Sequence, residues 1–407
     1  MVKTGCDILT SEGFLRLKGK KTSLLSNPAS VCHDLAHIID RCLENDVSLV
    51  CLFGPQHGLK GDTQANMIEW EGYTHPKASV PVHSLYGKTR VPTPEMLAGL
   101  DTVLIDLPDI GARPYTYIWT AALMMKECAR LGISVMVADR PNPLGGTIVE
   151  GQILEDEYRS FVGLFPLLLR HGMTIGEILS MINTTENLGC DLEIVKMEGW
   201  DRDMSWDDTG QPWVLPSPNM PTPDTSTVYP GMVFLEATNI SEGRGTTRPF
   251  EILGAPWIDG KNLAGALSES GIDGAVFRPL EFTPAWDKYE KQLCGGVQIH
   301  VTDRKAFRPV RAAAVLIQTI ARLYPDNFEW LDPPYEYDEI HMPIDILSGG
   351  PQLRETVDAA SGIKNRHDEY IEMNEPSGLP GGLGTLFDRW SDDEERFIKT
   401  RSPFLLY

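Results

Sequence analysis

Four short runs of aliphatic and β-branched residues constrain the fold of this chain most strongly, because none of them alternates strictly with polar residues. The runs are Thr22–Leu25, Ser48–Phe53, Thr102–Leu107 and Ile133–Ala138. Continuous apolar runs of this length are typical of strands buried on both faces of a parallel sheet. Helix-length segments with spaced apolar positions separate them. The β-α-β-α order predicts an α/β fold with a Rossmann-like, doubly wound parallel sheet and right-handed crossovers.

The pattern changes in the second half of the chain. A length of 407 residues suggests two or three domains, at roughly 100–200 residues each. Residues 200–230 are rich in turn formers and predict a long ordered loop region. After Pro256 we expect a helix at Ala264–Leu267, a strand at Val297–Val301 and a long helix at Val310–Leu323. We therefore predict a Rossmann-like catalytic domain over residues 1–255 and a smaller α/β C-terminal auxiliary domain over residues 256–407.

The net charge and the cysteine content limit which classes of partner and which cellular compartment we expect. The formal net charge of −21 repels nucleic-acid phosphates and anionic membranes, and no run of Lys or Arg overrides it, so we expect neither partner. The beginning of the chain lacks the apolar core of a signal peptide, and no later segment has ~18 uninterrupted apolar residues. Seven cysteines without C-x-x-C spacing fit a reducing compartment and indicate no metal site. We expect a cytoplasmic protein.

The loops that follow the four predicted strands are loaded with polar side chains. In an open α/β sheet, ligands bind outside the carboxyl ends of the strands. Glycine and proline fix the backbone of each loop, so the polar groups between them are held in place. Any one of these residues is equally well explained as a turn or a helix cap, whereas four such loops at one sheet edge predict a binding site. The loops are Ser26–Pro28, Gly54–Gly58, Pro108–Arg113 and Asp139–Gly146.

No phosphate-binding motif occurs in these loops. Neither G-x-G-x-x-G nor G-x-x-x-x-G-K-[ST] is present, so the sheet lacks the phosphate cradle of a nicotinamide or nucleotide site. We predict no cofactor, and a dehydrogenase is the weakest of the functions considered.

A second polar cluster lies outside the predicted sheet, in Pro216–Pro221 and Asn239–Glu251. Its arginines, Arg244 and Arg248, are of the type that clamps a carboxylate bidentately. The alternative is a salt-bridged connection between the domains. Three aromatic residues after Arg113 either stack on a sugar or pack in the core; they are Tyr115, Tyr117 and Trp119.

Hydrolysis of a glycosidic bond ordinarily requires two carboxyl groups, one protonated and one ionised. The sequence offers several candidates and does not measure their separation: Asp109, Glu69, Glu71, Asp139, Glu150, Glu236 and Glu242.

At these same loops the chain resembles a known family, the exo-β-N-acetylmuramidases, formerly described as a domain of unknown function. The resemblance extends from about Leu24 to Asp303 and weakens toward the C-terminus. Nine ordered blocks carry it: LLSNPASV, LFGPQHGLKGD, VPVHSLYG, IDLPDIGARPYTY, ADRPNPLGG, LLRHGMTIGE, LPSPNMPTPDTSTVYPG, ATNISEGRGTTRPFEILGAPW and CGGVQIHVTD.

The resemblance implies a glycoside hydrolase with a cleft between two domains, where terminal N-acetylmuramic acid is released from peptidoglycan-derived fragments. The lactyl carboxylate of that sugar would suit Arg244 or Arg248. The resemblance also implies further site residues: His57, Asp109, Arg113, Tyr117, Arg140, Asn142, Asn219 and Glu242. The first loop adds Asn27 to the predicted substrate-binding residues.

One departure from the family pattern separates two hypotheses. The family commonly has Pro-Glu-His-Gly where this chain has Pro55-Gln56-His57-Gly58, and that glutamate resembles a catalytic carboxyl. An amide cannot exchange the proton as a carboxyl does. The chain is either a hydrolase in which Glu242, Asp109 or Glu69 supplies the acid and base, or a sugar-acid binding protein that lost hydrolysis. The stretch Gln64–Glu71 also differs from the usual Ala-Gly-Glu pattern.

Overall fold

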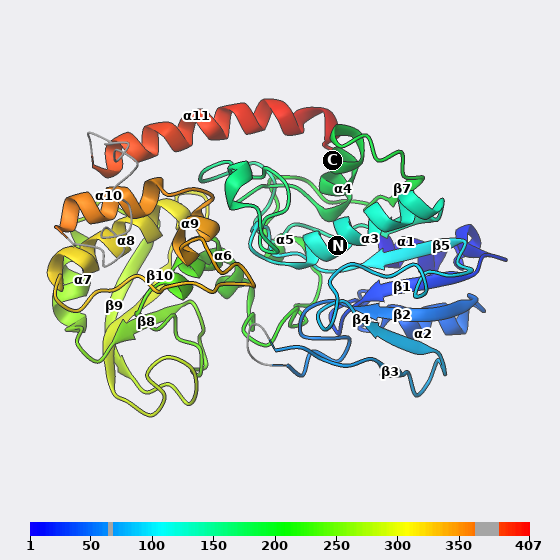
Figure 1. Cartoon of the computed structure of the whole chain (residues 1–407), viewed down its shortest axis with the longest axis horizontal. Coiled ribbons are helices and arrows are strands. Elements are labelled where there is room, and N and C mark those ends of the chain that lie inside the picture. The colour runs from blue at the N-terminus through cyan, green and yellow to red at the C-terminus, as the bar shows by residue number, and fades with distance from the viewer. Residues whose placement is uncertain (64–67, 363–381) are drawn as a thin grey trace. The chain divides into compact units, whose positions relative to one another are not determined.

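The computed structural model describes residues 1–63, 68–362 and 382–407. The chain forms two compact units (Figure 1). Unit 1 comprises residues 1–148, 172–223 and 400–407, and unit 2 comprises residues 149–171 and 224–399. The chain thus passes between the units several times.

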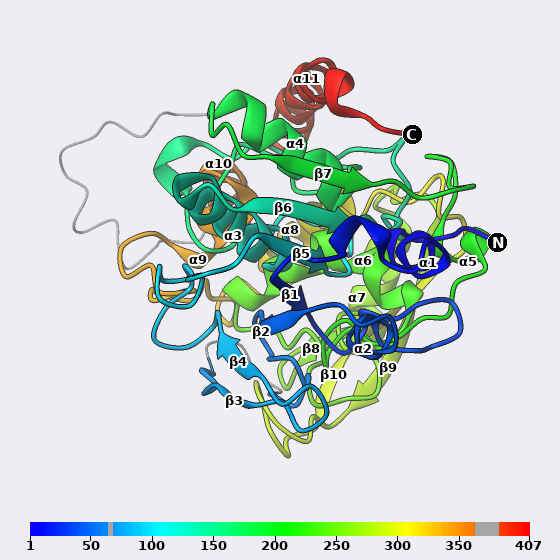
Figure 2. The same cartoon turned by 90° about the vertical axis from the view of Figure 1, so that its right-hand side faces the viewer.

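Unit 1 is built on a seven-stranded sheet with the order β3-β4-β2-β1-β5-β6-β7 (Figure 2). All neighbouring pairs are parallel except β3 and β4, which are antiparallel. Its strands are β1 (Thr22–Ser26), β2 (Leu49–Gly54), β3 (Tyr73–Thr74), β4 (Pro81–Ser84), β5 (Thr102–Asp106), β6 (Ser134–Ala138) and β7 (Leu192–Val195). The doubly wound parallel sheet predicted from the sequence is confirmed, and the four predicted strands are β1, β2, β5 and β6.

The helices of unit 1 are α1 (Gly5–Ser11), α2 (Ile38–Glu44), α3 (Tyr117–Leu131), α4 (Ile175–Thr185) and the short α5 (Trp206–Thr209). Single-turn 3₁₀ helices lie at η1 (Leu15–Leu17) and η5 (Ser402–Phe404).

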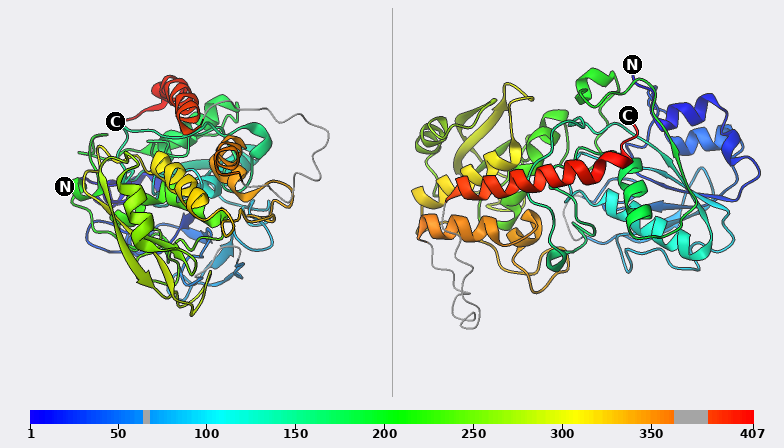
Figure 3. Two further views of the ribbon diagram at one scale, coloured as in Figure 1. Left: turned by 90° about the vertical axis from the view of Figure 1, so that its left-hand side faces the viewer. Right: turned by 90° about the horizontal axis from the view of Figure 1, so that it is seen from above.

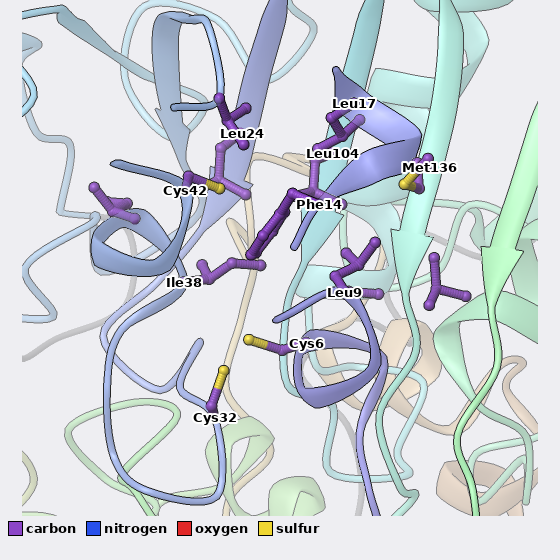
Figure 4. Packing of buried hydrophobic residues seen from close by; sticks show 14 of the residues in the cluster. Cys6, Leu9, Phe14, Leu17, Leu24, Cys32, Ile38, Cys42, Leu104 and Met136 are labelled. Atoms are coloured by element: carbon purple, nitrogen blue, oxygen red, sulfur yellow. The ribbon is translucent and has the colours of Figure 1, made fainter. Parts of the chain in front are cut away.

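The apolar runs form strands because both faces of the sheet are covered. Leu24, Leu52, Leu104 and Met136 lie in register across four strands and point into one core. Residues of α1, α2 and the intervening Phe14 complete this core (Figure 4). The alternate strand positions are buried as well. This double burial explains why these strands show no polar alternation.

Unit 2 contains an antiparallel three-stranded sheet of order β8-β10-β9. Helix α7 packs on β9 and β10. Helix α11 runs beside α8, where Arg311 and Glu394 form an ion pair of 3.0 Å (Figure 3). The elements that include unit 2 residues are η2 (Asp156–Tyr158), α6 (Pro223–Met232), η3 (Val233–Ala237), β8 (Ile252–Ala255), α7 (Gly260–Ser268), β9 (Ala275–Phe282), β10 (Cys294–Val301), α8 (Pro309–Leu323), α9 (Pro343–Ser348), α10 (Gln352–Ser361) and α11 (Leu383–Arg401).

The division into units differs from the boundary that the sequence suggests between residues 255 and 256. Unit 2 takes over at Asp224, and β8, which ends at Ala255, already pairs with β10 of the second sheet. The change in composition at Pro256 therefore follows a strand of unit 2. The expected loop region of residues 200–230 also contains α5 and the start of α6.

Within residues 1–63, 68–362 and 382–407, no helix combines the length and the apolar character needed to span a bilayer.

The close packing of α6 against the start of α8 predicts that Gly231 cannot be replaced by a larger residue without loss of stability. A Cβ atom on Gly231 would lie 1.9 Å from the carbonyl oxygen of Pro309, a backbone atom that cannot step aside. We expect Gly231→Ala to lower the free energy of unfolding by about 1–3 kcal/mol, measured by urea denaturation.

Gly265→Ala provides the matched control. It also lies in a helix, and an added Cβ would meet no atom within 4 Å. It should raise stability by roughly 0.5–1 kcal/mol, since alanine is the better helix former. Equal stability of the two variants would show that the close contact is absent.

Candidate active site

The sheet of unit 1 has one topological switch point, between β1 and β5. From β1 the chain moves to β2 on one side, whereas β5 leads to β6 and β7 on the other. Connections diverge there, and open α/β sheets bind their ligands at such a point, outside the carboxyl ends of the strands. Ser26 and Asp106, the last residues of β1 and β5, are paired. The predicted site loops begin immediately after them.

A buried ion pair joins the three loops that follow β1, β5 and β6. Arg140 donates through Nε to Asp106 Oδ1 at 2.5 Å and through Nη2 to Asp106 Oδ2 at 2.9 Å. Its Nη2 also donates to the Val31 carbonyl at 2.9 Å, and Ser30 Oγ donates to the Asp106 carbonyl at 2.5 Å. Arg140, predicted as a substrate-binding residue, is thus engaged by the protein itself.

Asn27 and Tyr117 converge on one backbone carbonyl. Asn27 Nδ2 and the Tyr117 hydroxyl both donate to Pro216 O, at 2.9 and 2.7 Å. Asn27 Oδ1 accepts from the Ala29 amide at 3.0 Å, and both side chains are buried. These two predicted sugar-binding residues hold the segment around Pro216 in place. Tyr115 and Trp119 are buried too, so this aromatic group packs inside the unit.

The turn after β2 fixes the orientation of Gln56 and His57. Gln56 Oε1 accepts from Thr116 Oγ1 at 2.7 Å, just before α3 begins. His57 has a φ of 66°, a left-handed conformation that is strained for a non-glycine residue and is often found at functional sites. Its Nδ1 lies 2.7 Å from the Thr63 carbonyl, which can only accept. Nδ1 therefore carries the proton.

Trp70 packs against the same turn. Its Nε1 donates to the Pro55 carbonyl at 3.0 Å, and a Cβ on Gly54 would lie 2.8 Å from its ring. The neighbours of Trp70 in the chain, Glu69 and Glu71, are exposed and flank this contact. The residues 64–67 that precede them lie outside the described part of the chain.

Asp109 and Asn142 occupy the adjoining loops after β5 and β6. Asp109 is buried, and its Oδ2 accepts from the Gly111 amide at 2.9 Å. A Cβ on Gly111 would lie 2.5 Å from Asn142 Oδ1, so the two loops pass in close contact. Asn142 Nδ2 donates to the Met173 carbonyl at 3.0 Å. Arg113 is fully buried, and this burial lowers the pKa of its guanidinium to about 9.

A cavity of about 20 Å³ lies at this edge of the sheet. Its volume accommodates about one water molecule. Trp206 and Trp213 line it, with ring centroids 5.0 Å apart at 90°. Asp109 and Arg140 also contribute to its wall. The tryptophans are absent from the site residues predicted from the sequence; the signal available was their position in a turn-rich segment. Asn219 is buried in the same segment.

Three predicted site residues belong to unit 2. Glu242 is buried, with its carboxylate 3.0 Å from Arg244 Nε and 3.0 Å from Lys288 Nζ. Arg244 also lies 2.5 Å from Glu236. The side chain of Arg248 is 43% exposed and lies 3.2 Å from Glu251. Arg244 is therefore enclosed by carboxylates of the protein, and Arg248 is the more accessible of the two arginines.

The charges around Glu242 keep it ionised. Burial alone would raise its pKa, but attraction to Lys288 and Arg244 outweighs burial and holds the pKa below its usual value.

The structure therefore assembles most predicted residues at the carboxyl edge of the unit 1 sheet or in the loops attached to it: Asn27, Gln56, His57, Glu69, Asp109, Arg113, Tyr117, Arg140, Asn142 and Asn219. Glu242, Arg244 and Arg248 lie in unit 2. In the described part of the chain, no three His, Cys, Asp or Glu side chains are grouped to hold a metal ion.

Comparison with known proteins confirms the resemblance carried by these loops. Family models described as the N-terminal and C-terminal parts of exo-beta-N-acetylmuramidase NamZ match residues 22–224 and 227–374. The peptidoglycan beta-N-acetylmuramidase NamZ of Bacillus subtilis (strain 168) is 44% identical over 407 residues, covering 100% of this chain and 91% of that protein.

Two crystal structures of DUF1343 family proteins from Bacteroides fragilis NCTC 9343 have a similar fold. Each comparison covers 100% of this chain and 99% of the other. One has a TM-score of 0.86 at 33% identity, and the second has a TM-score of 0.74 at 26% identity. Together, the family matches on both parts of the chain and the full-length similarity show that this chain belongs to the NamZ family of exo-β-N-acetylmuramidases.

Proposed function

We propose that this chain is a glycoside hydrolase that releases terminal N-acetylmuramic acid from peptidoglycan-derived fragments. The name of the Bacillus subtilis relative supports this substrate class. The observation that carries the proposal is the convergence of polar loops on the β1/β5 switch point, where open α/β sheets bind their ligands. Preorganised side chains at this edge include Asp109 and His57.

We assign the two reacting carboxyl groups to Asp109 and Glu69. One protonates the glycosidic oxygen as it leaves, and the other activates water or attacks the anomeric carbon. Asp109 is oriented by the Gly111 amide, and Glu69 is exposed next to Trp70, which is bound to the turn containing Gln56. Glu69 thus replaces the carboxyl that the family pattern places at position 56.

Glu242 is unsuited to act as the general acid. A general acid must hold a proton at the working pH, and Arg244 and Lys288 stabilise the ionised form of Glu242. We propose that Glu242 positions Arg244. Of the two arginines, Arg248 has the accessible guanidinium and is the one able to bind an anionic group.

A second candidate function is binding of a sugar acid without hydrolysis. The observation that favours it is the amide of Gln56, which accepts a hydrogen bond from Thr116 at the family's carboxyl position. An amide at this position binds polar groups without exchanging a proton.

We further propose a cytoplasmic role in recycling wall fragments. All seven cysteines are free and buried in the structure, which fits a reducing compartment. Detection of the chain in the cytosolic fraction of its cell, free of periplasmic or secreted markers, is the expected result, and its recovery outside the cell would overturn this proposal.

The first prediction from this site concerns the carboxyl pair. Asp109→Asn and Glu69→Gln should each lower kcat on a chromogenic N-acetylmuramic acid β-glycoside by at least ~10², with little change in KM. Glu95→Gln, an exposed carboxyl in the same unit, is the matched control and should leave kcat unchanged. If Glu242→Gln abolishes turnover while both pair variants remain active, the assignment is wrong.

The second prediction separates the hydrolase from the binding protein. If Glu69 has replaced the family carboxyl, the unmodified chain hydrolyses the glycoside, and Gln56→Glu alters its rate by less than about tenfold. An inactive parent that binds N-acetylmuramic acid in calorimetry and gains turnover through Gln56→Glu would instead identify the binding protein.

The third prediction concerns the tryptophans at the cavity. Removing an aromatic ring that stacks on the sugar costs about 1 kcal/mol, so Trp206→Ala should raise KM roughly fivefold to tenfold. Trp206→Phe retains an aromatic face and should restore most of the affinity. An unchanged KM in both variants would show that the sugar does not contact Trp206.

A further inference from the structure

Two buried cysteines from separate segments of unit 1 face one another. Cys6 lies in the first turn of α1, and Cys32 lies in the loop after β1. Their relative exposures are 0% and 2%. Figure 4 shows the two sulfur atoms pointing toward each other across the edge of the core. Neither thiol takes part in the proposed hydrolysis.

A chain of hydrogen bonds orders this pair. The Thr10 hydroxyl donates its only proton to the Cys6 carbonyl at 2.8 Å. At 3.4 Å from Cys32 Sγ it therefore acts as the acceptor, so the Cys32 thiol donates to Thr10. The Cys6 and Cys32 side chains interact with each other, which links the ionisation of the two thiols.

The electrostatic setting distinguishes Cys32 from the other cysteines. The hydrogen bond from Cys6 is the main cause that lowers the pKa of Cys32, against the effect of burial. Burial raises the pKa of Cys51 and Cys128 to about 12 and that of Cys190 and Cys294 to about 11. Thiolate character controls reactivity toward oxidants, so Cys32 is the most reactive of these thiols.

We propose that Cys6 and Cys32 are a peroxide-responsive dithiol that closes to a reversible disulfide. The Cys32 thiolate attacks one oxygen of hydrogen peroxide, the O–O bond breaks, and hydroxide leaves and takes a proton to become water. Cys32 is then a sulfenic acid. The Cys6 sulfur attacks the sulfenic sulfur, the S–O bond breaks, and the thiol proton leaves with the hydroxyl as a second water. Two thiols are oxidised by two electrons and one peroxide is reduced.

The disulfide would tie α1 to the loop that frames the candidate active site. Cys32 closes this loop through its amide, which donates to the Ala36 carbonyl at 2.9 Å. In the same loop, Ser30 and Val31 contact Asp106 and Arg140. Oxidation therefore links α1 covalently to the loop that contacts the ion pair. This holds for any reaction that the site performs.

The test uses the full-length reduced protein and hydrogen peroxide as the probe. After brief exposure, remaining thiols are alkylated in denaturant and the digest is analysed by mass spectrometry. We expect a Cys6–Cys32 linked peptide that dithiothreitol reverses, and a thermal midpoint higher by on the order of 5 °C in the oxidised protein. Cys190→Ser, the matched control at another buried thiol, should leave the linked peptide unchanged.

Two variants expose the order of the steps. In Cys6→Ser the sulfenic acid on Cys32 has no partner, so dimedone should trap it; in Cys32→Ser no sulfenic acid should form at position 6. The proposal is overturned if native wild-type protein gives no Cys6–Cys32 peptide while other cysteines oxidise, or if the linked form has a lower thermal midpoint. The wild-type measurement decides the matter even where a variant fails to fold.

Discussion

The buried ion pair between Asp106 and Arg140 is the interaction on which the candidate site depends. Asp106 ends β5 at the switch point, and Arg140 follows β6. Their bidentate contact, together with the bonds to Ser30 and Val31, ties three loops to one point. Removing one partner of such a pair leaves an uncompensated buried charge, which costs about 3–5 kcal/mol. The conformation of all three loops therefore depends on this ion pair.

Around this pair, residues divide into those that hold the loops and those that can meet a ligand. Asn27 and Tyr117 share the Pro216 carbonyl, and Asn142 is bound to Met173. These buried side chains hold the backbone of the loops in place, and other residues contact the ligand. Glu69 lies exposed at the rim, and Trp206 is partly exposed. A rigid buried layer beneath a few accessible groups is the arrangement that preorganises a catalytic site.

The sequence predicts the first sheet well because double burial leaves a direct mark on strand composition. The runs at β1, β2, β5 and β6 are continuous and apolar for that reason. It does not locate the domain boundary, because β8 becomes a strand of the second sheet only through pairing with β10, far along the chain. The sequence does not predict helix α6 either, since this helix contains Pro230 and several threonine and serine residues.

Within the site, the sequence identifies the loops but not the partners of their side chains. Arg140 and Arg244 are both arginines in polar loops, and in the structure both are enclosed by carboxylates of the protein. Asp106 and Glu236, which engage them, are distinguished from other carboxylates only by tertiary contacts. The sequence does not identify Trp206 as a site residue, because the turn-rich composition around it indicates no fixed place at the sheet edge.

The most direct test of this account is a crystal structure of the full chain soaked with N-acetylmuramic acid. The sugar should lie at the carboxyl ends of β1 and β5, with Asp109 and Glu69 approaching its anomeric carbon and the carboxyl groups about 5–9.5 Å apart. Sugar density elsewhere on the molecule, with the loops after β1 and β5 making no contact to it, would contradict the account.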